Sequence, residues 1–191
     1  VTTSRGKSGQ KHWMSGGMSS KLMAKLDIPV LLVQGSQPSE IVDAFQKILL
    51  PLDGSIVSEC TLPYARLFAK TFGSEITLLS VPEVPEIGNY RAAPDVVDIL
   101  RQEAEYKMHN FLEAVSRDLK KDDLQVEVIV QGSRPANTIV DIGEKGGYDL
   151  VFVTAKGRSG FDLTMIGSTA ERIVESSELS VCMVPVMNNN H

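Results

Sequence analysis

The chain contains two related copies of a 33-residue segment, and this repeat strongly restricts how it can fold. Residues 1–33 align without a gap on residues 152–184. The identical pairs are Thr3/Thr154, Gly6/Gly157, Ser8/Ser159, Gly9/Gly160, Met14/Met165, Gly16/Gly167, Val30/Val181 and Val33/Val184. Each copy runs from a basic loop rich in Gly and Ser to a short helix and then to an apolar strand. The repeat therefore predicts that residues 1–33 are the C-terminal part of a first domain.

The remaining chain is expected to form one complete domain. Residues 34–45 are polar and contain Gly, Pro and Ser, which predicts a linker. The complete domain is expected at residues 46–187, followed by a tail at residues 188–191. A lone helix and strand cannot bury a core of their own. Residues 1–33 must therefore pack on the complete domain, on a second chain or on further segments of the first domain.

Apolar stretches of strand length alternate with helical patterns along the complete domain. The expected strands are 47–53, 75–81, 125–130, 149–154 and 181–186. Four helices are expected. The first begins with an N-cap at Ser58, and the second covers 95–120 with Val96 and Leu100 toward the core. The third covers 136–145, and the fourth begins at Ser168. Continuously apolar strands that alternate with helices are typical of a parallel sheet covered on both faces. We therefore predict an α/β fold of Rossmann-like type with a five-stranded parallel sheet.

The composition excludes several classes of protein. The net charge of −5 argues against a broad nucleic-acid-binding surface, which needs an excess of Lys and Arg. The apolar stretches are far shorter than the roughly 20 residues of a membrane span. Cys60 and Cys182 form no CxxC pair, and no His or Cys has metal-ligand spacing. We expect a cytoplasmic protein without a metal site, a nucleic-acid partner or a membrane partner.

A glycine-rich loop follows the fourth expected strand and opens a helix. Its glycines would let backbone N–H groups approach a phosphate, and its basic residues would add positive charge. The candidate ligand residues here are Thr154, Lys156, Gly157, Arg158, Gly160, Gly167, Ser168 and Thr169. The alternative interpretation is a strand-to-helix turn whose basic residues are solvated. The loop is neither a Walker A loop nor a GxGxxG motif.

Further candidates lie where the first two strands end. In a doubly wound sheet, ligands bind at the carboxyl ends of the strands, where the strand order reverses. Pro51, Asp53 and Val81 occupy such ends. The Asp53 carboxylate could accept a hydrogen bond from an exocyclic amine or a ribose hydroxyl. Equally, it could satisfy backbone donors near a helix terminus.

Together these residues resemble the universal stress protein family. The resemblance covers residues 46–187 as a complete domain and residues 1–33 as the end of another. It rests on the first strand with Asp53-Gly-Ser, on the second and fourth strands, and on a loop pattern of Gly, two residues, Gly, nine residues, Gly, then Ser or Thr. Gly157, Gly167 and Ser168 match this pattern, whereas Thr154 stands at its first glycine. The implied fold is the Rossmann-like, adenine nucleotide alpha hydrolase-like type.

The resemblance also implies a ligand and an assembly. Asp53 and the Val81 backbone would contact adenine and ribose, while Gly157, Gly167 and Ser168 would hold the phosphates of ATP with Mg²⁺. The last strand would pair with its equivalent, either in a homodimer or in an intramolecular pseudo-dimer between tandem domains.

Three functions follow from these observations. The first is a regulatory or sensor module in stress response that binds an adenine nucleotide. It would not be an enzyme, except for slow hydrolysis of ATP. The second is an interaction module that binds no nucleotide and dimerises through its last strand, which the Thr154 substitution favours. The third is a flavodoxin-like domain, which would be yellow.

Overall fold

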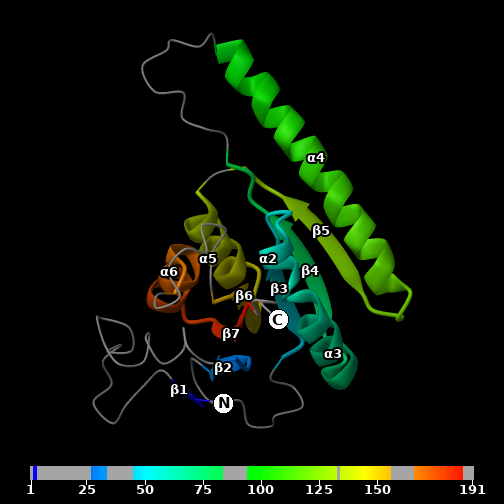
Figure 1. Ribbon diagram of the computed structural model, residues 1–191, viewed down its shortest axis with the longest axis vertical. Coiled ribbons are helices and arrows are strands. Elements are labelled where there is room, and N and C mark those ends of the chain that lie inside the picture. Colours follow the sequence, from blue (N-terminus) through cyan, green and yellow to red (C-terminus); the bar gives the residue numbers. More distant parts are fainter. Residues whose placement is uncertain are drawn as a thin grey trace, which may run out of the picture.

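The computed structural model describes residues 2–3, 27–33, 45–83, 94–132, 134–155 and 166–186. Within these residues, a single mixed sheet has helices on both faces (Figure 1). The strands are β1 (Thr2–Thr3), β2 (Val30–Val33), β3 (Lys47–Pro51), β4 (Glu75–Ser80), β5 (Val126–Val130), β6 (Leu150–Thr154) and β7 (Ser180–Val184). The helices are α2 (Ile56–Glu59), α3 (Leu62–Phe72), α4 (Pro94–Lys120), α5 (Pro135–Lys145) and α6 (Ser168–Ser176).

The strand order confirms the predicted parallel α/β architecture and extends it. The sheet has the order β1-β2-β7-β6-β3-β4-β5. The pairs β3–β4, β4–β5, β3–β6 and β6–β7 are parallel, which accounts for the five expected strands. Beyond them, β2 pairs antiparallel with β7, and β1 pairs parallel with β2. The N-terminal copy of the repeat therefore enlarges the sheet of the complete domain.

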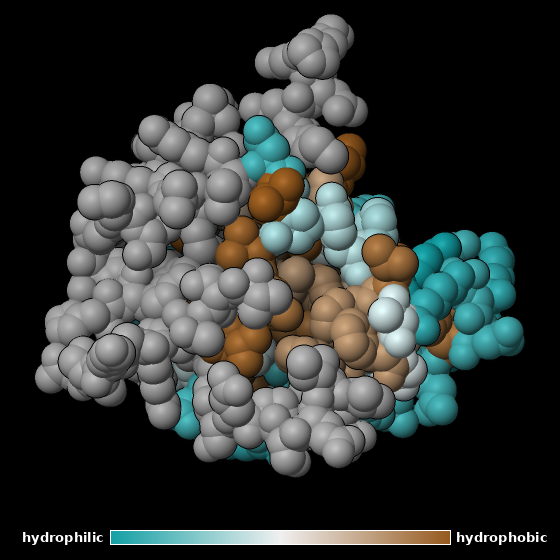
Figure 2. Space-filling model, turned by 90° about the horizontal axis from the view of Figure 1, so that it is seen from below, coloured by the Kyte–Doolittle hydropathy of each residue, from teal (hydrophilic) through white to brown (hydrophobic). Residues whose placement is uncertain are grey.

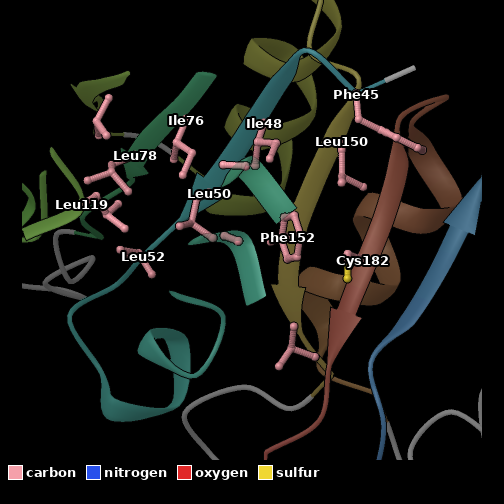
Figure 3. Packing of buried hydrophobic residues seen from close by; sticks show 14 of the residues in the cluster. Phe45, Ile48, Leu50, Leu52, Ile76, Leu78, Leu119, Leu150, Phe152 and Cys182 are labelled. Atoms are coloured by element: carbon pink, nitrogen blue, oxygen red, sulfur yellow. The ribbon is translucent and has the colours of Figure 1, made fainter. Parts of the chain in front are cut away.

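Two hydrophobic cores lie on the two faces of the sheet, because the central strands are apolar at consecutive positions. In β3, Leu49 belongs to the core under α5 and α6, whereas Ile48 and Leu50 belong to the core under α3 and α4. All three side chains are fully buried. Figure 3 shows the second core, with Leu50 and Phe152 near its centre. Side chains on a strand alternate between faces, so an unbroken apolar run is what a sheet covered on both sides requires.

The first helical segment of the domain divides into two helices. The expected N-cap, Ser58, lies inside α2 instead, and Ser55 caps α2 by accepting a 3.1 Å hydrogen bond from the Ser58 backbone N–H. A second helix, α3, begins after Thr61, with Pro63 in its first turn. Proline has no N–H to donate, so it is tolerated in the first turn of a helix but not in its interior. Pro63 therefore favours the start of a new helix at this point over continuation of α2.

The structure corrects two expectations about apolar side chains. Val96 and Leu100 do not reach the core, since 46% and 38% of their surfaces are exposed. A helix of 27 residues is about 40 Å long, whereas five-residue β5 spans only about 17 Å. The first turns of α4 therefore extend past the end of β5 (Figure 1). Conversely, Phe45, expected in the linker, is buried, and its ring lies 5.3 Å from that of Phe68.

The pairing of β2 with β7 joins equivalent parts of the two repeat copies. Leu31 lies directly opposite Cys182, and these two residues also correspond in the repeat alignment. In β1, Thr3 pairs with Val33, just as Thr154 pairs with Val184 in the complete domain. The first copy thus reproduces the local register of β6 and β7.

No helix in the described part of the chain is both long enough and apolar enough to cross a membrane. The longest helix, α4, instead carries charged residues at its C-terminal end. Hydrophilic residues gather on that side of the molecule in Figure 2, whereas hydrophobic residues gather near the middle of the same face.

An ion-pair network connects α3 to the end of α4. Arg66 contacts Asp118 and lies 3.2 Å from Asp122, while Lys70 lies 2.8 Å from Asp122. Lys121 pairs with Asp118 at 3.1 Å. Hydrogen bonds from Lys121 and Arg66 lower the pKa of Asp118, and a hydrogen bond from Lys70 lowers the pKa of Asp122. Both carboxylates are therefore better stabilised in the folded chain than in the unfolded chain.

We expect this network to make stability dependent on pH under acidic conditions. Because both folded-state pKa values lie below the ordinary 3.8, the stabilisation is present above that value and is lost as pH falls through the folded values. The double variant Asp118→Asn/Asp122→Asn should lose less stability than the unaltered chain between neutral pH and about pH 3. Urea unfolding at successive pH values measures this. High salt should shrink the difference, because these exposed pairs are screened. If the unfolding free energies of the variant and the unaltered chain fell in parallel with pH, this prediction would be wrong.

Candidate functional site

The strand order reverses between β3 and β6. From β3 the chain continues to β4 and β5 on one side, and then returns to β6 and β7 on the other. β3 and β6 are parallel neighbours, with Ile48 opposite Leu150, so their carboxyl ends lie side by side. This is the position at which ligands bind in open α/β sheets. The candidate site is therefore the edge formed by the ends of β3, β4 and β6 and the start of α6.

At the end of β3, hydrogen bonds hold the Asp53 carboxylate. Its Oδ1 atom accepts bonds from the Ser55 backbone N–H at 3.0 Å and from the Ser55 hydroxyl at 2.6 Å. The Asp53 backbone N–H lies 3.3 Å from the Ser58 hydroxyl oxygen. Gly54 turns the chain with a φ of +75°, a conformation that L side chains rarely adopt. Asp53 thus satisfies local donors, as the alternative interpretation expected, while its side chain remains exposed at the edge.

The ends of β3 and β4 are tied together beyond their last paired residues. Pro51 is half-buried opposite Leu79, and the Leu52 backbone N–H donates to the Leu79 carbonyl at 2.8 Å. Val81 follows β4, and its half-buried side chain packs against the core under α5 and α6. Because this side chain is used by the core, Val81 can offer a ligand chiefly its backbone.

The two ends of the glycine-rich loop meet. The Ala155 backbone N–H donates to Val184 at 2.8 Å, which holds the start of the loop on β7. The Gly167 backbone N–H donates to the Ala155 carbonyl at 2.9 Å, so the loop closes where it began. Thr154 is half-buried as the last residue of β6. The candidates Lys156, Gly157, Arg158 and Gly160 lie outside the described residues.

Helix α6 begins at this closure. Its N-cap, Gly167, has an extended backbone with φ −62° and ψ 142°, and it has no side chain to cap the helix. Ser168 and Thr169, the first two residues of α6, are exposed. The first N–H groups of a helix have no acceptors within the helix, and they carry a partial positive charge. Helix N-termini with such unpaired N–H groups are favourable positions for phosphate.

The seven described candidates thus lie at one edge of the sheet, because the carboxyl ends of its parallel strands share that edge. They are Pro51, Asp53, Val81, Thr154, Gly167, Ser168 and Thr169. Two further participants were not predicted: Ser55, which donates twice to Asp53, and Ala155, which closes the loop. A serine two residues after an aspartate is a common turn arrangement, so the sequence could have indicated Ser55. Ala155 carries no comparable signal.

The described residues contain no group of three or more His, Cys, Asp or Glu side chains that could hold a metal ion. Cys60 and Cys182 are free thiols. Burial raises the pKa of the Cys182 thiol to about 12, so this thiol is not a nucleophile in the folded chain.

Comparison with known proteins identifies a family to which this chain is similar. The family model described as the universal stress protein family matches residues 44–185. Universal stress protein MJ0531 of Methanocaldococcus jannaschii is 27% identical over 146 residues, which cover 73% of this chain and 82% of that protein. The solved structure of hypothetical protein MJ0577, from the same organism, matches with a TM-score of 0.69 and 25% identity over 76% of this chain and 99% of that chain.

A further solved structure is described as a universal stress protein in complex with cAMP. It matches with a TM-score of 0.57 and 21% identity, and the match covers 74% of this chain and 98% of that chain. At this identity, the likeness concerns the fold alone.

Proposed function

The chain belongs to the universal stress protein family, and on that premise we propose that it is a cytoplasmic, non-enzymatic regulatory module in stress response that binds an adenine nucleotide such as ATP. The observation that carries the proposal is the closure of the loop by Gly167 and Ala155 beside the end of β3. It brings the start of α6 to the edge at which Asp53 is exposed. A carboxylate on one side and a helix start on the other suit a ligand with a polar base or ribose at one end and phosphate at the other.

Each candidate then has a role. Asp53 would accept from the base or ribose, and the Val81 backbone would contact the base. Gly157, Gly167 and Ser168 would hold phosphate through N–H and hydroxyl donors. Lys156 and Arg158 would add positive charge. Mg²⁺ usually binds through substrate phosphates and a few carboxylates rather than in an all-protein site. A magnesium ion would therefore be held mainly by the nucleotide.

Titration calorimetry with Mg-ATP tests this proposal. We expect Asp53→Ala to weaken binding about 10- to 100-fold, since a hydrogen bond to a charged group contributes about 1.5–3 kcal/mol. Asp141→Ala, which removes an exposed carboxylate from α5 on the surface, is the matched control and should bind like the unaltered chain. Separate titrations with ADP, AMP and cAMP determine which nucleotide is preferred; the cAMP-bound relative in the same fold motivates the last of these.

The second candidate function is an interaction module that binds no nucleotide. Two observations favour it: Thr154 places a side chain at the first glycine of the loop pattern, and β2 occupies the outer edge of β7. In this proposal the copy at residues 1–33 takes the place of a second subunit, which makes an intramolecular pseudo-dimer. Absence of binding heat from every nucleotide, together with no nucleotide released from the purified protein, would favour this function over the first.

A further inference from the structure

Two serine hydroxyls in the turn after β3 make different kinds of hydrogen bond. The Ser55 Oγ atom accepts from the Ser58 backbone N–H at 3.1 Å and lies 2.6 Å from the Asp53 Oδ1 atom. A backbone N–H can only donate and a serine hydroxyl has a single proton, so Ser55 directs its proton to Asp53. The Ser58 hydroxyl bonds two backbone groups instead: it donates to the Ser55 carbonyl at 2.9 Å and accepts from the Asp53 N–H at 3.3 Å.

The start of α2 fixes the direction of the Ser55 hydroxyl. Ser55 is the N-cap of this helix, with an extended backbone at φ −86° and ψ 148°. A serine side chain can adopt three staggered rotamers, and the bond from the Ser58 N–H selects the one that caps the helix. In that rotamer the hydroxyl also reaches the Asp53 carboxylate. The helix cap and the orientation of the carboxylate are therefore one arrangement.

Neighbouring elements hold the backbone on both sides of Asp53. Before it, the Leu52 N–H donates to the Leu79 carbonyl at 2.8 Å. After it, Gly54 lies against α4, since a Cβ atom at Gly54 would be 3.4 Å from the Met108 Cε atom. The freedom that remains is rotation of the Asp53 side chain, whose terminal torsion is intrinsically broad. The bonds from Ser55 restrict this rotation.

We infer that Ser55 is a positioning residue for ligand binding: its hydroxyl holds the Asp53 carboxylate in the orientation that accepts from the base or ribose. The inference rests on the proposed nucleotide binding and names a further residue of that site. A carboxylate that is already oriented loses less side-chain freedom when the ligand binds. Without the hydroxyl, the Ser55 backbone N–H would still donate to Oδ1 at 3.0 Å, so the loss of affinity should be partial.

A double-mutant cycle measured by titration with Mg-ATP tests this inference. Ser55→Ala should weaken binding about fivefold, which is less than the effect expected for Asp53→Ala. The double variant Asp53→Ala/Ser55→Ala should bind like Asp53→Ala alone, within about twofold, because Ser55 acts through the carboxylate. A purely structural Ser55 would weaken binding by the same factor in both backgrounds. Urea unfolding of each variant measures the separate loss of the helix cap.

Ser58→Ala is the matched control, because it removes a hydroxyl from the same turn that bonds backbone groups. It should change affinity less than about twofold, even where stability falls. Ser55→Thr keeps both the cap and the hydroxyl and should bind like the unaltered chain.

The outcomes separate this inference from the proposed function. If Asp53→Ala weakens binding and Ser55→Ala does not, the inference is wrong and the proposed function stands. If the double variant binds about fivefold more weakly than Asp53→Ala, Ser55 does not act through Asp53, and the inference is again wrong. If the unaltered chain binds no nucleotide, both the proposed function and the inference are wrong.

Discussion

Replacing Phe152 with alanine is expected to lower the free energy of unfolding by about 3–5 kcal/mol. Phe152 lies in the middle of β6, is 1% exposed, and faces the core under α3 and α4. Its ring meets that of Phe68 edge-on at 5.7 Å, which links the sheet to α3. It is also paired in register with Cys182 of β7 (Figure 3). Truncation would leave a cavity between two layers that cannot close by moving one side chain.

The size of this effect matters because domains of this kind are stable by only about 5–15 kcal/mol. Urea unfolding of the variant measures the loss. Leu67→Ala is the matched control: it truncates an apolar side chain on α3, the helix that Phe152 contacts through Phe68, but Leu67 is 65% exposed. That variant should change stability by less than about 0.5 kcal/mol. If both variants lost similar amounts of unfolding free energy, burial in this core would not be what determines the effect of truncating Phe152.

The architecture around Phe152 could be predicted because local sequence determines it. Runs such as Ile48–Leu50 are apolar at consecutive positions, and their short length between turn residues favours a strand buried on both faces over a buried helix. The same reasoning indicates where strands end, so it located Asp53, Val81 and Thr154 without any contact information. Because the strands are parallel, placing their ends also placed these residues at one edge.

Other features depend on contacts between residues far apart in the chain, and these the pattern could not provide. Periodicity shows that one face of α4 is apolar, but not that the sheet beneath Val96 and Leu100 has already ended. Composition assigned Phe45 to a linker, although its ring packs edge-on against the rings of Phe68 and Phe72 on α3, at 5.3 Å and 6.1 Å. The hydrogen bond from Gly167 to Ala155 likewise depends on where the loop returns, which no local spacing indicates.

The same limit applies to the N-terminal copy of the repeat. Its similarity to residues 152–184 indicated a strand at its end, and the need to bury that strand indicated a packing partner. Neither determined that Leu31 would lie opposite its own counterpart Cys182. The repeat shows only that the two sequences are related. The register that places equivalent residues opposite each other is determined by the tertiary structure.

Thr154→Gly is expected to tighten Mg-ATP binding about tenfold, equivalent to about 1.4 kcal/mol. Thr154 is the half-buried last residue of β6, directly before Ala155, which closes the loop, and it stands at the first glycine of the family pattern. Without its side chain, the backbone could approach a phosphate more closely. The same change should lower the free energy of unfolding by about 0.5–1 kcal/mol, because glycine in a strand loses more conformational freedom on folding.

These opposite effects distinguish a site effect from a general change in stability. Calorimetry and urea unfolding of one preparation measure both. Adding Gly167→Val to Thr154→Gly should abolish the gain in affinity by covering the start of α6. It should not strain the backbone, because Gly167 has an extended conformation that valine readily adopts. If Thr154→Gly weakens the fold and leaves affinity unchanged, the loop as a whole does not bind phosphate. The pairing of β2 with β7 would then be the feature of this chain most directly connected to its function.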